Sequence, residues 1–486
     1  MAENVINRKM GIKRISSFTV ITSILFLFQL ATAAQTKTVH QTTKPNVIFI
    51  YIDDMGYADL SCYGNKEIET PNMDRLAKEG IKFTDFYVSS PVCSPSRAGI
   101  VTGQYPGRNR IYGYIDSRWK NEQRHMANWL DPGAPTIAKT FKKSGYKTAH
   151  IGKWHLGGGR DIGNAPLPET YGYDKTLVAF EGLGNRVLIK NFDLLNDASA
   201  NLGQGHITWV DHDWQKTPLF VDTTISFIEK HQHQPFYIEL WLNDVHDPFD
   251  PNPEFLKKFK RFANDKYKQQ YYATIYEVDQ EVGRLLNILD HSGLSKNTII
   301  IFSSDNGPTD WPRYYRDDYC PPGSVGYFRG RKWSLYEGGI REPLLVRWPD
   351  HITAGKIDST TIIAGTDLLP TLCKLAQVPL PVANLDGEDM SKSWKGNPQE
   401  RTKPLMWEYG LNDQFLKPGN PRYRSPSLAI RDEQWKLLVN ADGSDMELYN
   451  LQEDIAESKN IARDFPTIAK KLSNEVIDWW KTMPEK

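Results

Sequence analysis

One short stretch contains the residues best suited to chemistry. Residues 91–103 read Pro-Val-Cys-Ser-Pro-Ser-Arg-Ala-Gly-Ile-Val-Thr-Gly, with Cys93 before a Pro-Ser-Arg turn and Arg97 four residues further on. Helix-compatible residues continue to Thr102, and Gly103 supplies a stop. A thiol at a helix N-terminus beside an arginine lies in a positive local field, which favours either a thiolate or a bound oxyanion substrate. Taken alone, Cys93 would more simply be a small buried residue in a turn.

Oxygen-bearing side chains follow two apolar runs of the chain. Residues 46–52 and 298–302 are rich in β-branched residues, as expected of buried parallel strands. The oxygen donors that follow them are Asp53, Asp54, Asp305 and Asn306. Adjacent carboxylates repel each other unless a cation lies between them, and ligands bind at this edge of open α/β sheets. A solvated loop is the alternative, but hard oxygen donors without histidine or thiolate suit Ca²⁺ or Mg²⁺ better than zinc.

Basic side chains and histidines recur beside glycines and strand ends. They are Arg97, Lys153, His155, His246 and Lys332. Lys153 and His155 are two residues apart, so in an extended segment they would face the same side. Each one alone could be a solvated surface residue. Together they suit a tetrahedral oxyanion, whose charge must be stabilised while one bond breaks. The pattern therefore predicts hydrolysis of a phosphate or sulfate ester.

The elements that must position these residues alternate along the chain. Strands are predicted at 46–52, 81–87, 146–151, 235–242, 298–302 and 344–348, and helices at 70–80, 135–143, 271–289 and 367–372. This alternation predicts an α/β fold with a large, mostly parallel sheet sandwiched by helices. Three short strands between 427 and 451 and a helix at 465–482 predict a smaller C-terminal antiparallel sheet plus helix.

The N-terminus carries a targeting pattern. Basic residues precede an apolar run at 18–30, and Ala31-Thr32-Ala33 is a small-residue cleavage pattern. We expect residues 1–33 to be a signal peptide and the protein to be exported, either periplasmic or secreted. A membrane anchor is the alternative, but the run is short and contains polar residues, so no stable anchor is expected. We expect a catalytic domain at 34–390 and a C-terminal α+β subdomain at 391–486.

The composition is that of a globular protein. The 486 residues are 12% aromatic and 24% charged, and 59 basic residues balance 59 acidic residues. No charge excess points to nucleic acid as a partner. The four cysteines, Cys62, Cys93, Cys320 and Cys373, are too few for a disulfide scaffold, although an exported chain can still form one bridge.

Three sequence blocks resemble those of the type I sulfatases, members of the alkaline-phosphatase-like superfamily. Residues 93–103 match the Cys-x-Pro-Ser-Arg-x-x-x-x-Thr-Gly signature, and 152–155 and 337–343 resemble two further blocks. The resemblance runs in order from Asn46 to about Pro343, and the C-terminal unit fits it too. The resemblance implies an alkaline-phosphatase-like fold and sulfuric ester hydrolase activity. The chain is similar to bacterial enzymes that desulfate polysaccharide fragments.

The resemblance also implies a role for each site residue. A maturation enzyme would convert Cys93 to formylglycine before folding, and one hydroxyl of the hydrated aldehyde would attack sulfur while the other would later expel sulfate. Ca²⁺ would be held by Asp53, Asp54, Asp305 and Asn306 together with residue 93. Arg97 and Lys153 would stabilise the hydrate, His155 would act as a base, and His246 and Lys332 would bind sulfate and assist the leaving oxygen. One departure is that Asp247 follows His246, where the family often has a small residue.

The substrate is less defined by the sequence. Arginines and aromatic residues between the blocks suit a sulfated carbohydrate, including one with neighbouring uronates or sulfates, or they are ordinary packing and surface. They include Arg108, Arg110, Arg118, Trp119, Trp129, Arg160, His206, His212, Trp214, Trp311, Arg313, Tyr314, Tyr315 and Arg316. Two alternatives stay open: a phosphatase, phosphodiester or phosphonate hydrolase of the same superfamily, and a sulfoglycan-binding protein with an inactive site.

Overall fold

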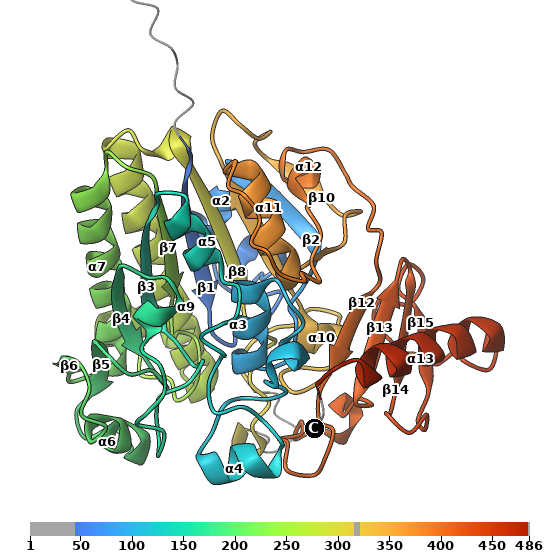
Figure 1. The fold of residues 1–486 in the computed structure, drawn as a ribbon. Coiled ribbons are helices and arrows are strands. Elements are labelled where there is room, and N and C mark those ends of the chain that lie inside the picture. The colour runs from blue at the N-terminus through green and yellow to red at the C-terminus, as the bar shows by residue number, and fades with distance from the viewer. Residues whose placement is uncertain (1–43, 315–320, 485–486) are drawn as a thin grey trace, which may run out of the picture. The chain divides into compact units, whose positions relative to one another are not determined.

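An 11-stranded sheet lies at the centre of the fold (Figure 1). The structure, a computed structural model, describes residues 44–314 and 321–484. The strands run in the order β10-β2-β9-β8-β1-β7-β3-β4-β5-β6, and β11 also pairs with β2. Their bounds are β1 (Asn46–Ile52), β2 (Ile81–Tyr87), β3 (Lys147–Lys153), β4 (Lys175–Ala179), β5 (Arg186–Ile189), β6 (Ile207–Val210), β7 (Phe236–Trp241), β8 (Thr298–Ser304), β9 (Arg341–Arg347), β10 (Lys356–Asp358) and β11 (Ile363–Ala364).

Most strand pairs in this sheet are parallel. The central strand β1 is parallel to both neighbours, β7 and β8, whereas β9 runs antiparallel to β8 and β2. The predicted mostly parallel sheet is therefore confirmed. The sequence did not predict β4, β5 and β6, which extend the sheet at one edge, or the short strands β10 and β11 at the other.

Helices cover both faces of the sheet (Figure 1). Their bounds are α2 (Pro71–Lys78), α3 (Cys93–Thr102), α4 (Arg118–Gln123), α5 (Ile137–Lys143), α6 (Leu194–Ala200), α7 (Lys216–His231), α8 (Pro253–Leu256), α9 (Lys266–His291), α10 (Glu337–Ile340), α11 (Leu368–Leu375), α12 (Ser391–Trp394) and α13 (Pro466–Lys481). The helix predicted at 271–289 begins earlier, at Lys266, and α7 was not predicted.

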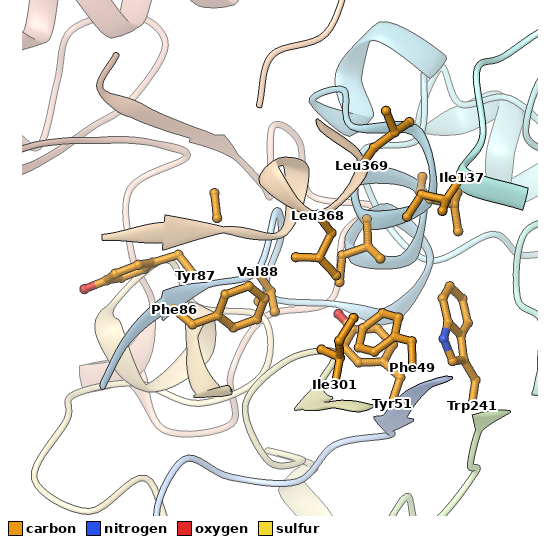
Figure 2. Packing of buried hydrophobic residues seen from close by; sticks show 14 of the residues in the cluster. Phe49, Tyr51, Phe86, Tyr87, Val88, Ile137, Trp241, Ile301, Leu368 and Leu369 are labelled. Atoms are coloured by element: carbon orange, nitrogen blue, oxygen red, sulfur yellow. The ribbon is translucent and has the colours of Figure 1, made fainter. Parts of the chain in front are cut away.

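The alternation of side chains along β1 explains why the whole strand is apolar. Phe49 and Tyr51 pack in the cluster that contains residues of α3, α5 and α11, and Figure 2 shows them beside Trp241 and Ile301. Ile48 and Ile50 point to the other face, in the cluster formed with α2, α7 and α9. Because both faces are buried, no polar face remains, as is usual for a parallel strand in an α/β sheet.

Helix α3 begins at Cys93, as predicted. Val92 before it is extended, and Gly103 after it takes a left-handed conformation with φ 66°, which ends the helix. All ten helical residues are buried, so α3 is a core element that carries polar residues. Cys93 is therefore fixed at the helix N-terminus, beside the carboxyl ends of the strands.

The predicted C-terminal antiparallel sheet is also present. It contains β12 (Leu405–Glu408), β13 (Leu428–Asp432), β14 (Trp435–Val439) and β15 (Glu447–Asn450), and α13 packs on it. Lys436 on β14 forms two buried ion pairs, one with Glu337 on α10 at 2.9 Å and one with Glu457, which follows β15, at 2.8 Å. The boundary predicted at residue 391 stays a prediction.

The signal peptide predicted at 1–33 lies outside the described residues, as does Cys320. Within the described ranges, no helix is both long and apolar enough to cross a membrane. Cys62, Cys93 and Cys373 have free thiols.

Candidate active site

The site lies at the carboxyl ends of the central strands. Parallel pairing of β1 with β8 sets Ile52 opposite Ser304, so the residues that follow these strands meet at one edge of the sheet. The backbone N–H of Asp54 donates to Asp305 Oδ1 at 3.2 Å, which joins the two loops directly. Helix α3 brings Cys93 to the same place, where its thiol donates to Asp53 Oδ1 at 3.6 Å. The structure thus brings together the oxygen donors predicted from the sequence.

Each of the three carboxylates contacts one of the predicted cations. Lys153 Nζ lies 2.5 Å from Asp53, Lys332 Nζ lies 2.6 Å from both oxygens of Asp54, and Arg97 donates to Asp305 Oδ2 from Nε at 3.0 Å and from Nη2 at 2.7 Å. These residues are all at most 3% exposed. Since a buried charge is costly unless it is paired, every group in this cluster depends on its neighbours.

Burial and charge act in opposite directions on these acids. Burial raises the pKa of Asp53, but Lys153 and His246 outweigh it and hold that pKa well below its usual range. Burial and the neighbouring Asp53 raise the pKa of Asp305 to about 6, against the opposing charge of Arg97. The same burial therefore has different outcomes: the neighbouring cations dominate at Asp53, whereas desolvation together with Asp53 dominates at Asp305.

The thiol of Cys93 is poorly suited to act as a thiolate. Burial raises its pKa to about 12, although Lys153 and Lys332 lower it. The positive field at the helix N-terminus does not outweigh desolvation here. Burial therefore disfavours a thiolate nucleophile at this position.

The donor set fits a hard divalent cation. Ligand atoms of Asp53, Cys93 and Asp305 lie within 4.8 Å of one another. Asn306 donates to Asp54 Oδ1 at 2.7 Å, while its own Oδ1 is buried and has no hydrogen-bond partner among the described residues. Clustered carboxylate oxygens and an unpartnered amide oxygen are ligands that Ca²⁺ uses. The residues present thus fit a hard divalent cation, while the full predicted ligand set stays a prediction.

The two histidines occupy different parts of the wall. His246 Nδ1 lies 2.6 Å from the carbonyl oxygen of Asp247, and Nε2 lies 3.5 Å from Asp54 Oδ2. A proton on Nδ1 would satisfy this carbonyl and leave Nε2 facing the site. Burial lowers the pKa of His246 to about 4. Burial also lowers the pKa of His155 well below its usual value, and its Nδ1 has no partner among the described residues.

The prediction that Lys153 and His155 face the same side of one extended segment was wrong. Strand β3 ends at Lys153, and His155 has a left-handed backbone with φ 51°, so the two residues do not share an extended segment. Both side chains nevertheless line the same cavity. The turn through Trp154, rather than strand alternation, brings them there.

A cavity of about 420 Å³ opens above the cluster. Cys93, Lys153, His155, His246 and Lys332 all line it, together with Asp53. Among the residues considered for substrate recognition, Arg160, Trp311 and Arg313 also line it. Others serve elsewhere: Arg108 pairs with Asp386 at 2.6 Å, and Trp119 is 60% exposed. Tyr315 and Arg316 lie outside the described residues.

Sequence reasoning missed several residues of this wall. Asp116, Glu181, Asp213 and Asp247 line the cavity, and none lies in a predicted element. The sequence did point to Asp247, because this residue directly follows His246 at the position where the sequence departs from the family pattern. The other three are brought in by loops whose local sequence carries no periodicity.

The fold and the site together define an α/β protein whose cavity is suited to stabilise a tetrahedral oxyanion. Comparison with known proteins makes the class specific. The sulfatase family model matches residues 45–378, and a model described as N-sulphoglucosamine sulphohydrolase, C-terminal, matches residues 323–481. The chain belongs to the sulfatase family.

Individual relatives agree with this assignment. An N-acetylgalactosamine-6-O-sulfatase of Bacteroides thetaiotaomicron is 30% identical, covering 90% of this chain and 93% of the relative. Human arylsulfatase A is 30% identical over 82% of this chain and 76% of its own length. The crystal structure of Ps i-CgsB in complex with k-i-k-neocarrahexaose has a TM-score of 0.72 and 28% identity, covering 90% of this chain and 93% of that chain. The chain is a sulfate ester hydrolase, and phosphatase or phosphonate hydrolase activity has less support.

Proposed function

We propose that the protein releases inorganic sulfate from a sulfated carbohydrate, using a formylglycine formed from Cys93 and a bound Ca²⁺. The observation that carries the proposal is the position of Cys93, buried at the N-terminus of α3 between paired carboxylates and cations. Two comparisons support a carbohydrate substrate: one relative is named for a sulfated amino sugar, and one similar structure is a complex with a neocarrahexaose.

A modified residue 93 would not depend on a thiolate, which burial of the Cys93 thiol disfavours. A formylglycine at this position, once hydrated, supplies a hydroxyl nucleophile that needs no thiolate. Arg97 is held by Asp305 and by the carbonyl oxygen of Lys153 at 3.2 Å, so its guanidinium is fixed beside residue 93. Lys153 adds a second positive charge. These two side chains orient the nucleophile and stabilise negative charge that develops near it.

The remaining side chains handle protons and the sulfate group. His155 stays neutral at neutral pH because burial lowers its pKa, so it can accept a proton. His246 and Lys332 also line the cavity, where they can bind sulfate oxygens and assist the leaving oxygen. Asp53, Asp54, Asp305 and Asn306, with residue 93, would hold Ca²⁺, which supplies further positive charge to a sulfate oxygen.

We also propose the maturation route and domain organisation expected from the sequence. Residues 1–33 are a signal peptide, and the exported chain is periplasmic or secreted. A formylglycine-generating enzyme acts on Cys93. The catalytic domain spans 34–390, and the C-terminal subdomain spans 391–486.

The test combines activity with chemistry at residue 93. Purified protein is assayed on matched 4-nitrophenyl sulfate and 4-nitrophenyl phosphate, and on a panel of sulfated mono- and oligosaccharides with inorganic sulfate as readout. We expect sulfate ester turnover to exceed phosphate turnover, and a peptide mass covering Cys93 to show formylglycine. Faster phosphate turnover, or an unmodified cysteine in fully active enzyme, would overturn the proposal.

A further inference from the structure

The cavity wall beyond the catalytic cluster contains cations that are already paired. Arg160 donates to Glu181 at 2.7 Å and contacts Asp116 at 2.9 Å, and Lys120 contacts Asp116 at 3.2 Å. Both acids are buried, with side chains at most 3% exposed. On this side of the cavity, the two basic side chains are therefore neutralised by the protein itself.

Further basic side chains of the cavity lining are also engaged by the protein. Arg313 forms an ion pair with Asp247, and Lys216 forms one with Asp213. Arg186 turns away to backbone carbonyl oxygens, including that of Gly184 at 3.0 Å and that of Ser199 at 2.8 Å. Of the described lining residues outside the catalytic cluster, every lysine and arginine thus has an internal partner.

Asp247 is the most informative residue of this wall. Its side chain is 1% exposed and lines the cavity beside His246; Oδ2 forms the ion pair with Arg313, whereas Oδ1 accepts no hydrogen bond within the described part of the chain. Oδ1 has only His246 Nδ1 at 3.7 Å, beyond hydrogen-bond distance. Across the cavity, Glu181 Oε2 is likewise buried without a hydrogen-bond partner. Buried acceptors in a binding cavity need a donor, which either water or the ligand can supply.

These contacts separate two classes of substrate. A sugar hydroxyl or amide N–H donates a hydrogen bond and would satisfy Oδ1 of Asp247 and Oε2 of Glu181, the oxygens that the paired arginines leave without a donor. A carboxylate or second sulfate has no proton to donate, and it would face acidic groups whose partner cations are already engaged. Specificity often arises from such repulsion of the wrong ligand as well as from attraction of the right one.

We propose that the sugar carrying the scissile sulfate is otherwise uncharged, with hydroxyl or amide donors that bind Asp247 and Glu181. The cavity would thereby select against a second anionic substituent on that sugar. This inference rests on the proposed carbohydrate sulfatase function. It differs from the sequence-based expectation that arginines such as Arg160 and Arg313 bind neighbouring uronates or sulfates.

The experiment compares sugars that differ by one anionic group. N-acetylgalactosamine 6-sulfate is paired with its 4,6-disulfate, and N-acetylglucosamine 6-sulfate with N-sulfoglucosamine 6-sulfate. Loss of the 6-sulfate is followed by chromatography of the sugar product. For the pair that is hydrolysed faster, we expect kcat/KM to be at least tenfold higher for the singly charged member.

A variant of Asp247 tests whether this residue causes the preference for the singly charged sugar. Asp247→Asn keeps a similar shape and removes the charge. We therefore expect the ratio of kcat/KM for the singly charged sugar to that for the doubly charged sugar to fall at least threefold. Asp222→Asn is the matched control, because Asp222 pairs with Arg284 on the surface of α7, outside the cavity lining. The ratio of two kcat/KM values does not depend on the amount of active enzyme, so a partly misfolded variant still reports it.

The outcomes separate this inference from the function on which it rests. An equal or higher kcat/KM for the doubly charged sugars, or an unchanged preference in Asp247→Asn, overturns the inference while leaving carbohydrate sulfatase activity in place. Turnover of 4-nitrophenyl sulfate with none of the four sugars overturns the carbohydrate substrate and this inference together. No sulfate release from any substrate overturns the proposed function itself.

Discussion

Replacing Lys436 with methionine should destabilise the protein by a predictable amount. Lys436 contacts Glu337 and Glu457, and all three side chains are 0% exposed. Methionine has a similar length and no charge, so Lys436→Met leaves two buried carboxylates short of one cation. Glu337 keeps Arg341 at 3.1 Å and a hydrogen bond from Tyr87 at 2.6 Å, whereas Glu457 loses its ion-pair partner. Breaking a buried pair in this way costs about 3–5 kcal/mol.

This cost converts into a measurable shift of the melting temperature. An unfolding entropy of about 2.1 cal/mol/K per residue over the roughly 440 residues from Lys44 onward gives about 0.9 kcal/mol/K. A loss of 3–5 kcal/mol therefore lowers Tm by about 3–5 °C, measured by scanning calorimetry at pH 8. Lys471→Met is the control, because Lys471 pairs with Asp432 on the surface with its side chain 66% exposed, and we expect a shift of about 1 °C or less.

The effect of pH has a definite sign. Burial raises the pKa of Glu457 to about 7 while Lys436 lowers it, so removing Lys436 raises that pKa further. An acid whose folded-state pKa exceeds its unfolded value, about 4.3, destabilises the folded state increasingly as pH rises through that interval. The Tm deficit of Lys436→Met should therefore shrink between pH 8 and pH 5. A Tm shift no larger than that of the control, or a deficit that grows on acidification, would refute this account of the ion pairs.

Three further predictions concern the site. Cys93→Ala should lower kcat for sulfate release by roughly 10⁴-fold or more while leaving Tm within a few degrees; substantial residual turnover would exclude residue 93 as the nucleophile. Arg97→Lys keeps the charge but loses the two-pronged contact with Asp305, so kcat should fall about 10²–10³-fold, and a loss below tenfold would contradict its proposed role. Treatment with EDTA should abolish activity and added Ca²⁺ should restore it, as measured by sulfate release after dialysis; full activity in metal-free protein would remove the metal from the proposal.

The central sheet could be predicted because its strands are buried on both faces. In β1 and β8, continuous β-branched runs leave no alternative to a buried strand, and the acids that follow them then meet at one edge. The edge strand β6 was missed because its four residues are partly or fully exposed, so they form no apolar run. Helix α7 was missed although it packs on β3 and β7, because its threonines and Pro218 obscure the helical pattern.

The catalytic cluster was more predictable than the cavity wall around it. Asp53 and Lys153 lie at strand ends, where a local sequence pattern fixes their position. Glu181 follows β4 in a left-handed conformation with φ 57°, and its partner Arg160 also has a positive φ of 53°. No local pattern specifies such loops, whose conformations depend on contacts with distant segments. The acidic partners of the arginines in the cavity wall could therefore be identified only from the three-dimensional structure.

The burial of Cys93 has a consequence for the order of modification and folding during synthesis. Cys93 is 2% exposed and packs in the same core cluster as Trp407 and Tyr409, which lie more than 300 residues further along the chain. Trp407 also donates to the carbonyl oxygen of Val88, five residues before Cys93. Because all ten residues of α3 are buried in the finished fold, the maturation enzyme of the proposed function would act before this core, which includes residues of the second sheet, has formed. Slower synthesis of residues 390–440 would lengthen the time available for maturation.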